Sequence, residues 1–374
     1  MKSNKLKASI LGLFLFLMWV PMLQDNLHIF KGGELKGSFT QPENIVFDFK
    51  YWFDGTYNSK KEEYLSNAFG LRPDFVRIYN QLKFWFFKTS GNEKVVIGKE
   101  NYLYEQTYIN EYFGESFVGR PEIENRVKLL KELQDTLAAR GIFLYSVFAP
   151  GKGSFYPEFI PDYSHKSMQP NTNYSTYIEL CKKNGINFVD FRAWFLAMKD
   201  TATYRLFPRG GVHWSIYGGY LAFDSMVHYV EAETGLDLPD MQVDSIQLDT
   251  KPRSRDYDAG DGLNIISHLS HDTLAYPFYS VNYVGKDKVA SLTIADSYYY
   301  EIAYPFATTV FEDVSFWYYF LGFWSHTNRT STKGNIKNDL LNYKVVCLLY
   351  TDGSLANFGS GFIQTATTQF KEGK

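Results

Sequence analysis

The sequence predicts an α/β domain with a mostly parallel central sheet flanked by helices. Apolar side chains recur at helical spacing over residues 121–140, and a glycine and an apolar run at 142–148 follow at once. The same order of helix, glycine and apolar strand returns at 172–184 and GINFVDFR. Continuously apolar runs, such as YKVVCLLY at 343–350, are typical of parallel strands buried on both faces. Ligand sites of such sheets lie at the carboxyl ends of the strands.

The other elements continue this alternation. VVIGKENYLYEQ at 95–106 indicates a strand and turn that open the main domain after Gly91. In the helix at 121–140, Pro121 suits the first turn and Gly141 ends the helix. The further expected elements are a helix at 215–233, a strand at 289–295, a helix after Ser297 and a strand near 313–320.

Composition limits the classes of function. The chain has 374 residues, of which 45% are hydrophobic and 21% charged, so it can bury a full core in one large domain beside a smaller N-terminal part. A net charge of -3 without a basic cluster argues against nucleic acid as a partner. Cys181 and Cys347 form neither a disulfide framework nor a metal cluster, and no cofactor is implied. Aromatic residues make up 18%, which suits stacking on sugars, although a tyrosine-rich core gives the same composition.

The N-terminus predicts export and a membrane anchor over residues 1–24. Lys2, Lys5 and Lys7 precede an uncharged, mostly apolar run from Ala8 to Leu23, and no small-x-small cleavage site follows. We therefore expect an uncleaved signal anchor, with the lysines cytoplasmic and the bulk of the chain periplasmic or at the cell surface. Residues 25–90 are expected to form a tether and an N-terminal helical segment, whose aromatic helix packs on the main domain or meets lipid or a partner.

Ser297 is a candidate nucleophile. It follows VASLTIA at the carboxyl end of a predicted strand and precedes a predicted helix. This arrangement exposes a nucleophile and supplies an oxyanion donor from the next backbone N–H, here that of Tyr298. The alternative is that Asp296 or Ser297 only caps the helix.

His213 is the candidate general base. It lies in a turn with Gly210 and Gly211 before it and Trp214 after it, just before a helix whose expected N-cap is Ser215. A histidine in such an exposed turn can take a proton from a nucleophile.

Several motifs together resemble the alginate O-acetyltransferase group of SGNH-hydrolase-like proteins. These are H-W-S-x-Y-G at 213–218, P-x-K at 150–152, VIGKENYLY at 96–104 and A-D-S-Y at 295–298. Each motif is weak alone, but their order and spacing are fairly specific, and the resemblance covers roughly residues 60–365.

The resemblance implies an SGNH-hydrolase-like catalytic domain over residues 91–374. It implies an extracytoplasmic enzyme that moves acetyl groups onto exopolysaccharide hydroxyls, commonly beside a membrane-bound acyltransferase. It gives Ser297 the role of nucleophile and His213 that of base. The candidate substrate-binding residues are Lys152 of the P-x-K motif and the aromatic Trp214, Tyr299 and Tyr300 near the two catalytic candidates.

One departure concerns the acid of the triad. The best-studied members of the group carry aspartate two residues before the histidine, where this chain has Gly211. Losing the acid costs on the order of 10⁴ in rate in the protease triad. Asp258 and Asp261 in RDYDAGDG are the nearest replacements by composition, and Asp224 is more remote. If no acid takes this place, either a carbonyl orients His213 or the activity is weak.

Metal catalysis is disfavoured. RDYDAGDG fails the calcium-loop register, because Gly260 occupies the third ligand position and Ser267 replaces the closing glutamate. His268 and His271 with Asp272 lack a further ligand at helical spacing.

The sequence thus favours a membrane-anchored polysaccharide O-acetyltransferase working by ping-pong acyl transfer. A carbohydrate acetyl esterase would use the same two residues. A glycan-binding or scaffold protein with a decayed site is the third hypothesis, motivated by Gly211. Fold alone does not choose among them.

Overall fold

The computed structural model describes residues 2–27, 29, 33–37, 42–269 and 272–372. The chain divides into two compact units. The first comprises residues up to Glu93 together with Gly260–His268, and the second comprises Lys94–Ala259 and Leu269–Lys374.

The first unit is helical. Its helices are α1 (Lys2–Leu27), α2 (Phe49–Phe53), α3 (Thr56–Ala68) and α4 (Arg72–Phe87). Two polar residues of α4 hold the 260–268 segment. The Asn80 side-chain amide donates to the carbonyl oxygen of Leu263 at 2.8 Å, and Gln81 Oε1 accepts from the backbone N–H of Ile266 at 2.9 Å. The segment is therefore fixed to α4 although it is distant in sequence.

Helix α1 contains a segment that could cross a membrane. Lys5–Gln24 is long and apolar enough by length and composition, with a mean hydropathy of 2.0. None of its apolar window is buried within the structure. A retained anchor and a signal sequence both fit these properties.

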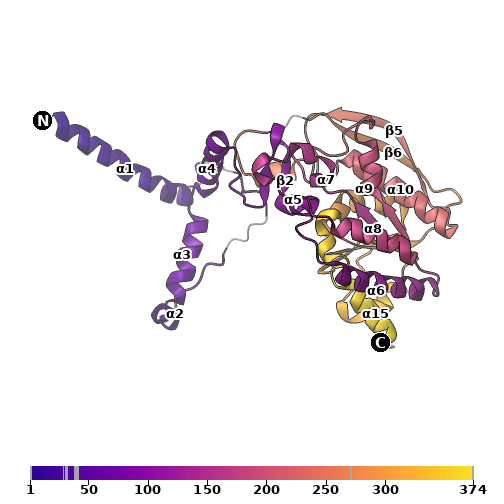
Figure 1. Cartoon of the computed structure of the whole chain (residues 1–374). Coiled ribbons are helices and arrows are strands. Elements are labelled where there is room, and N and C mark those ends of the chain that lie inside the picture. Colours follow the sequence, from indigo (N-terminus) through magenta and orange to yellow (C-terminus); the bar gives the residue numbers. More distant parts are fainter. Residues whose placement is uncertain (1, 28, 30–32, 38–41, 270–271, 373–374) are drawn as a thin grey trace. The chain divides into compact units, whose positions relative to one another are not determined.

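The second unit is built on a six-stranded sheet (Figure 1). The strand order is β4-β3-β10-β7-β8-β9, and every neighbouring pair is parallel except β8 and β9. The strands of this sheet are β3 (Phe143–Ala149), β4 (Phe188–Asp190), β7 (Ala290–Ala295), β8 (Asp313–Tyr318), β9 (Gly322–Ser325) and β10 (Val345–Thr351). The predicted α/β class with a mostly parallel sheet is confirmed.

Helices cover both faces of this sheet (Figure 1). On β3, the ring of Phe148 lies 6.1 Å from that of Tyr177 in α8, whereas Tyr145 lies 5.6 Å from Tyr229 in α10. Alternate side chains of a strand point to opposite faces, so α8 and α10 cover different faces. The helices that complete the unit are α5 (Gln106–Phe113), α6 (Arg120–Ala138), α7 (Lys152–Phe155), α8 (Asn173–Asn184), α9 (Phe191–Met198), α10 (Ile216–Thr234), α12 (Tyr300–Ile302), α13 (Thr308–Val310), α14 (Ile336–Leu340) and α15 (Phe362–Lys371).

Two antiparallel pairs lie outside the main sheet. The strands β1 (Val95–Ile97) and β2 (Leu103–Glu105) form the expected strand and turn at the start of the unit. The long strands β5 (Asp240–Asp249) and β6 (Leu274–Asn282) pair with each other, and the sequence did not predict them. The chain between β5 and β6 carries α11 (Asp258–Gly262), which begins at a residue of the candidate site.

Candidate active site

Ser297 lies at the carboxyl end of β7, a strand flanked by β10 and β8 near the middle of the sheet. The helix cap at this point is Asp296. Its carboxylate accepts hydrogen bonds from Tyr298 N–H at 3.1 Å and from the N–H and hydroxyl of Thr351, both at 2.8 Å. Asp296 therefore performs the capping role that was the alternative for Ser297, and the Ser297 hydroxyl has a different partner.

That partner is His213. Its Nε2 lies 2.8 Å from Ser297 Oγ, and its Nδ1 lies 2.6 Å from Asp258 Oδ2. His213 as a whole is only 4% exposed. The Ser215 side chain accepts from Gly218 N–H at 3.0 Å and starts α10, as expected, which fixes the chain just after the histidine. Serine, imidazole and carboxylate thus form one hydrogen-bonded chain.

Asp258 is held in place on the ring. Its Oδ1 accepts from the backbone N–H of Val212 at 3.0 Å and of Ala259 at 2.8 Å, which leaves Oδ2 for His213. Burial pushes the pKa of Asp258 upward, but the charge of His213 and these hydrogen bonds outweigh burial and lower the pKa below its ordinary value. Burial likewise acts to lower the pKa of His213, and the charge and hydrogen bond of Asp258 raise it above its ordinary value.

The glycine at position 211 has a steric explanation. A Cβ at Gly211 would lie 2.7 Å from the carbonyl oxygen of Arg255 and 2.9 Å from that of Asp256. The backbone leading to Asp258 therefore fills the space that an aspartate side chain at position 211 would need. The carboxylate that contacts the imidazole is instead that of Asp258, in the connection between β5 and β6.

Two other acids considered for this role have different partners. Asp261 Oδ2 pairs with Lys36 Nζ at 2.7 Å within the first unit. Asp224 Oδ2 lies 3.7 Å from His228 Nδ1 on α10. The expectation that Asp261 serves the histidine is corrected, because Asp258 occupies Nδ1 and Asp261 is engaged elsewhere.

The role expected of Tyr298 also needs correction. Its backbone N–H donates to Asp296, so it is not a free oxyanion donor in this structure. Its buried side chain supports the histidine instead: the hydroxyl donates to the Val212 carbonyl at 2.7 Å, and the ring centroid lies 4.9 Å from that of His213. The Trp214 indole in turn donates to the Tyr298 carbonyl at 3.2 Å.

Three expected substrate-binding residues are buried. Trp214, Tyr299 and Lys152 expose almost none of their surface, so they offer no face to a sugar. This corrects the expectation for these three, since helical spacing and motif position do not reveal which side chains point inward. Tyr300 is partly exposed, and the Arg255 guanidinium lies 4.3 Å from its ring centroid.

Lys152 organises the loop before the histidine. Its Nζ donates to the carbonyl oxygens of Arg209 and Gly211, both at 2.6 Å. The rings of Tyr102 and Tyr104 lie 5.6 and 5.7 Å away. Burial lowers the pKa of Lys152 to about 7. We infer that the buried amine positions the His213 loop and does not contact substrate.

Replacing Lys152 by methionine is expected to lower the free energy of unfolding by about 2–4 kcal/mol, because the buried carbonyl of Gly211 and the partly buried carbonyl of Arg209 lose their donor. Urea unfolding monitored by fluorescence measures this loss. Lys128→Met on the exposed face of α6 is the matched control and should unfold at the wild-type urea concentration. Equal midpoints for the two variants would contradict the role given to Lys152.

Glu105 is a site residue that the sequence did not reveal. It ends β2, is partly buried, and interacts electrostatically with His213, Asp258 and Asp296. Burial, the largest contribution, raises the pKa of its carboxyl above the ordinary value. Burial also raises the pKa of the Glu301 carboxyl, which lies beside Arg255. Nothing in the spacing of VIGKENYLYEQ marks Glu105 as a neighbour of residues more than a hundred positions away.

Within the described residues, no group of three or more His, Cys, Asp or Glu side chains lies close enough to hold a metal ion. His271, one of the metal-ligand candidates, lies outside the described residues. Asp272 is occupied: it accepts from the backbone N–H of Arg209 at 2.6 Å and pairs with the Arg209 side chain.

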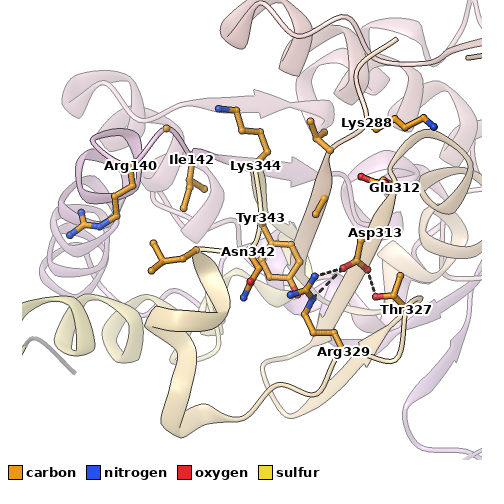
Figure 2. Close-up of a pocket in the computed structure, with 14 residues that line it drawn as sticks. Arg140, Ile142, Lys288, Glu312, Asp313, Thr327, Arg329, Asn342, Tyr343 and Lys344 are labelled. Carbon is orange, nitrogen blue, oxygen red and sulfur yellow. Dashed lines mark hydrogen bonds and ion pairs between the residues drawn. The ribbon is translucent and has the colours of Figure 1, made fainter. Parts of the chain in front are cut away.

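A separate pocket of about 720 Å³ lies away from this site (Figure 2). Ile142, Glu312 and Lys344, which line it, immediately precede β3, β8 and β10. It therefore lies at the amino ends of the strands, whereas Ser297 follows a carboxyl end. Figure 2 shows Arg329 and Asp313 of its lining joined by an ion pair, at 2.8 Å.

A family model described as "SGNH hydrolase-like domain, acetyltransferase AlgX" matches residues 95–290. The match includes His213 and Asp258 and ends before Ser297. No curated protein matches the sequence.

The fold is similar to several solved structures. The O-acetyltransferase domain of Pseudomonas putida AlgJ has a TM-score of 0.46 and 15% identity, covering 75% of this chain and 99% of that one. Bacillus cereus PatB1 has a TM-score of 0.45 and 12% identity, covering 71% and 97%. Pseudomonas aeruginosa AlgX has a TM-score of 0.40 and 13% identity, covering 69% and 55%.

Proposed function

Since the chain belongs to the family of SGNH hydrolase-like acetyltransferase domains of the AlgX type, we propose that it is a polysaccharide O-acetyltransferase that works through an acetyl-serine intermediate. The observation that carries this proposal is the hydrogen-bonded chain from Ser297 through His213 to Asp258 at the carboxyl ends of the parallel strands. A serine hydroxyl bonded to an imidazole, which is itself oriented by a carboxylate, is the arrangement of an activated nucleophile.

In the proposed first half-reaction, Ser297 Oγ attacks the acetyl carbonyl of the donor while His213 Nε2 takes the hydroxyl proton. The resulting imidazolium is stabilised by Asp258, whose two backbone hydrogen bonds hold it against the ring. The tetrahedral intermediate collapses, the protonated His213 returns the proton to the leaving group, and acetyl-Ser297 remains.

In the second half-reaction, His213 takes a proton from a sugar hydroxyl, which attacks the acetyl-serine carbonyl. Collapse of this intermediate releases the O-acetylated sugar and returns the proton to Ser297. The partial exposure of Ser297, in contrast to the burial of Asp296 and Tyr298 beside it, gives the donor and the acceptor access to the nucleophile.

We further propose that the catalytic unit works outside the cytoplasm, tethered by α1. The support is the Lys5–Gln24 segment together with Lys2, Lys5 and Lys7, which precede its apolar run from Ala8 to Leu23. A chain held at the membrane would receive acetyl groups from a membrane-bound acyltransferase, as the family resemblance implies.

The decayed-site alternative was motivated by Gly211. That reason is weakened, because Asp258 contacts the ring nitrogen that an acid two residues before the histidine would otherwise contact. The esterase alternative differs only in the acceptor, so an experiment must follow the acetyl group.

The test uses the full-length protein in detergent, treated with p-nitrophenyl acetate, quenched in acid and mapped by mass spectrometry. We expect one acetylated peptide containing Ser297, which loses its acetyl group faster when a soluble oligosaccharide is added and yields acetylated sugar. The heat-unfolded chain is the control for nonspecific acetylation. Acetyl-Ser297 that gives only free acetate would favour the esterase, and the absence of acetyl-Ser297 would contradict both enzyme hypotheses.

A further inference from the structure

A run of partly exposed aromatic side chains leads away from Ser297. Tyr300 follows Ser297 on the same helical segment, and Tyr304 lies one turn further, with the two rings nearly parallel and their centroids 6.4 Å apart. Trp324 of β9 extends the run, with its ring 4.9 Å from that of Tyr304. Tyr318 of β8 completes it, 5.4 Å from Tyr300. We call these four residues the aromatic platform.

The sheet explains why the platform adjoins Ser297. Tyr318 pairs with Ala295 in the register of β7 and β8, so it lies at the strand ends beside the serine. Phe316 pairs with Trp324 across β8 and β9, and its buried ring contacts Tyr300 at 5.0 Å. Phe316, Tyr318 and Trp324 share one face of the sheet because two-residue steps and cross-strand pairs do so. The buried Phe316 ring therefore packs beneath the platform and supports it.

The hydroxyl and indole N–H groups of the platform side chains have no hydrogen-bond partner in the described part of the chain. Within the described residues, no hydrogen bond engages the hydroxyls of Tyr300, Tyr304 and Tyr318 or the indole N–H of Trp324. Tyrosine and tryptophan tips usually find a partner when the ring is packed. Tyr304 is 51% exposed, and the other three are partly exposed. The platform thus offers apolar ring faces together with hydrogen-bonding groups.

Arg255 fixes one end of the platform. Its guanidinium lies over the Tyr300 ring at 4.3 Å and 3.7 Å from the buried carboxylate of Glu301. A stacked guanidinium keeps the ring in one orientation and leaves N–H groups at its edge. The Tyr300 ring is therefore held in place close to the nucleophile.

We propose that the aromatic platform is the acceptor subsite, and that it binds a chain of pyranose sugars whose C–H faces stack on Tyr318, Tyr300, Tyr304 and Trp324. Apolar faces edged by hydroxyl-binding groups match a pyranose, which has an apolar face and an equatorial rim of hydroxyls. Tyr318 lies at the strand end beside Ala295 and Tyr300 follows Ser297 by three residues, so a sugar on the platform would present a hydroxyl to the acetyl-serine. This inference rests on the proposed function for its location, but sugar binding itself needs no turnover.

The test measures binding by calorimetry in the full-length Ser297→Ala protein, which cannot form the intermediate. The probes are a neutral glucan, a uronate and an N-acetylhexosamine hexasaccharide. We expect at least one of them to bind, and Tyr304→Ala or Trp324→Ala in this background to weaken its binding about ten-fold. The matched control is Tyr283→Ala, which removes a tyrosine of similar exposure (53%) beyond the end of β6 and should bind as the parent does.

Near-ultraviolet circular dichroism identifies any variant that has lost its fold. Failure of all three probes to bind, or equal affinity in the Tyr304, Trp324 and Tyr283 variants, would overturn the subsite. These outcomes are distinct from failure of the acyl-transfer proposal, because acetylation of Ser297 is measured separately on the wild-type chain. The dependence of affinity on the probe's charge would identify the class of polysaccharide.

Discussion

Replacing Ser297 by alanine is expected to lower acetyl transfer on the order of 10⁶-fold, close to the background rate. The physical reason is that Ser297 carries the hydroxyl bonded to His213 Nε2, so its removal leaves the base without a nucleophile to activate. His213→Ala should cost nearly as much, because the serine is then not deprotonated. The double variant should be no slower than either single one, since the two groups act as a unit. Initial rates of acetyl transfer to an oligosaccharide measure all three.

Ser291→Ala is the matched control for this series. Ser291 lies at the opposite end of β7, is buried, and its hydroxyl has no hydrogen-bond partner in the described structure. Its removal should leave the rate at the wild-type value. A Ser297→Ala protein that keeps more than about a tenth of the wild-type rate would contradict the acetyl-serine mechanism.

The fold could be predicted where the sequence carries strong periodic patterns. Buried parallel strands are apolar throughout, so β3, β7 and β10 were found within a residue or two of their bounds. The strands β5 and β6 were missed. Their exposed faces carry polar residues, and their pairing joins segments well separated in sequence, which no local pattern records.

Because β5 and β6 were not predicted, the sequence could not identify the acid that contacts His213. The connection between β5 and β6 is the part of the chain that brings Asp258 to His213. Without the hairpin, composition alone could name Asp258 and Asp261 but could not choose between them. The contact that separates them is a long-range feature of the fold.

The same limit applies to the substrate side of the site. The sequence pointed to aromatic residues next to Ser297 and His213, and the structure buries Trp214 and Tyr299. Whether a ring points outward depends on neighbouring strands. Tyr318 and Trp324 come from β8 and β9, and only the register of these strands places the Tyr318 ring beside Tyr300 and the Trp324 ring beside Tyr304. The roles of Ser297 and His213 stay predictions until the rates are measured.

Replacing Asp258 by asparagine is expected to lower the rate of acetyl transfer on the order of 10⁴-fold, a smaller loss than that of Ser297→Ala or His213→Ala. Asparagine can still accept from Val212 and Ala259, so the loop keeps its geometry, but it does not stabilise the imidazolium or fix the imidazole tautomer. Asp261→Asn makes the same chemical change three residues away, in a carboxylate paired with Lys36, and should keep the wild-type rate. Equal losses in both variants would contradict the assignment.

The pH profile provides an independent test of the same contact. His213 must be neutral to act as a base, so kcat/KM should rise with pH through a pKa above the ordinary histidine value, where Asp258 holds it. In Asp258→Asn the charge that raises the pKa of His213 is gone, and burial, which lowers this pKa, dominates. The rise of kcat/KM should therefore move to lower pH. The raised pKa of His213 and the lowered pKa of Asp258 mean that this ion pair contributes stability in the pH range between them. That stability is lost as pH rises through the folded-state pKa of His213 and as pH falls through that of Asp258.

Gly211→Asp should not restore activity to Asp258→Asn, although it places an aspartate two residues before the histidine. The new Cβ would meet the Arg255 carbonyl oxygen at 2.7 Å, so the β5–β6 connection must move before that carboxylate can reach His213. Rescue by Gly211→Asp would show that the two acid positions are interchangeable in this fold. The expected result is no rescue, with the fold intact by circular dichroism. It would mean that the path of the backbone before Asp258 requires glycine at position 211.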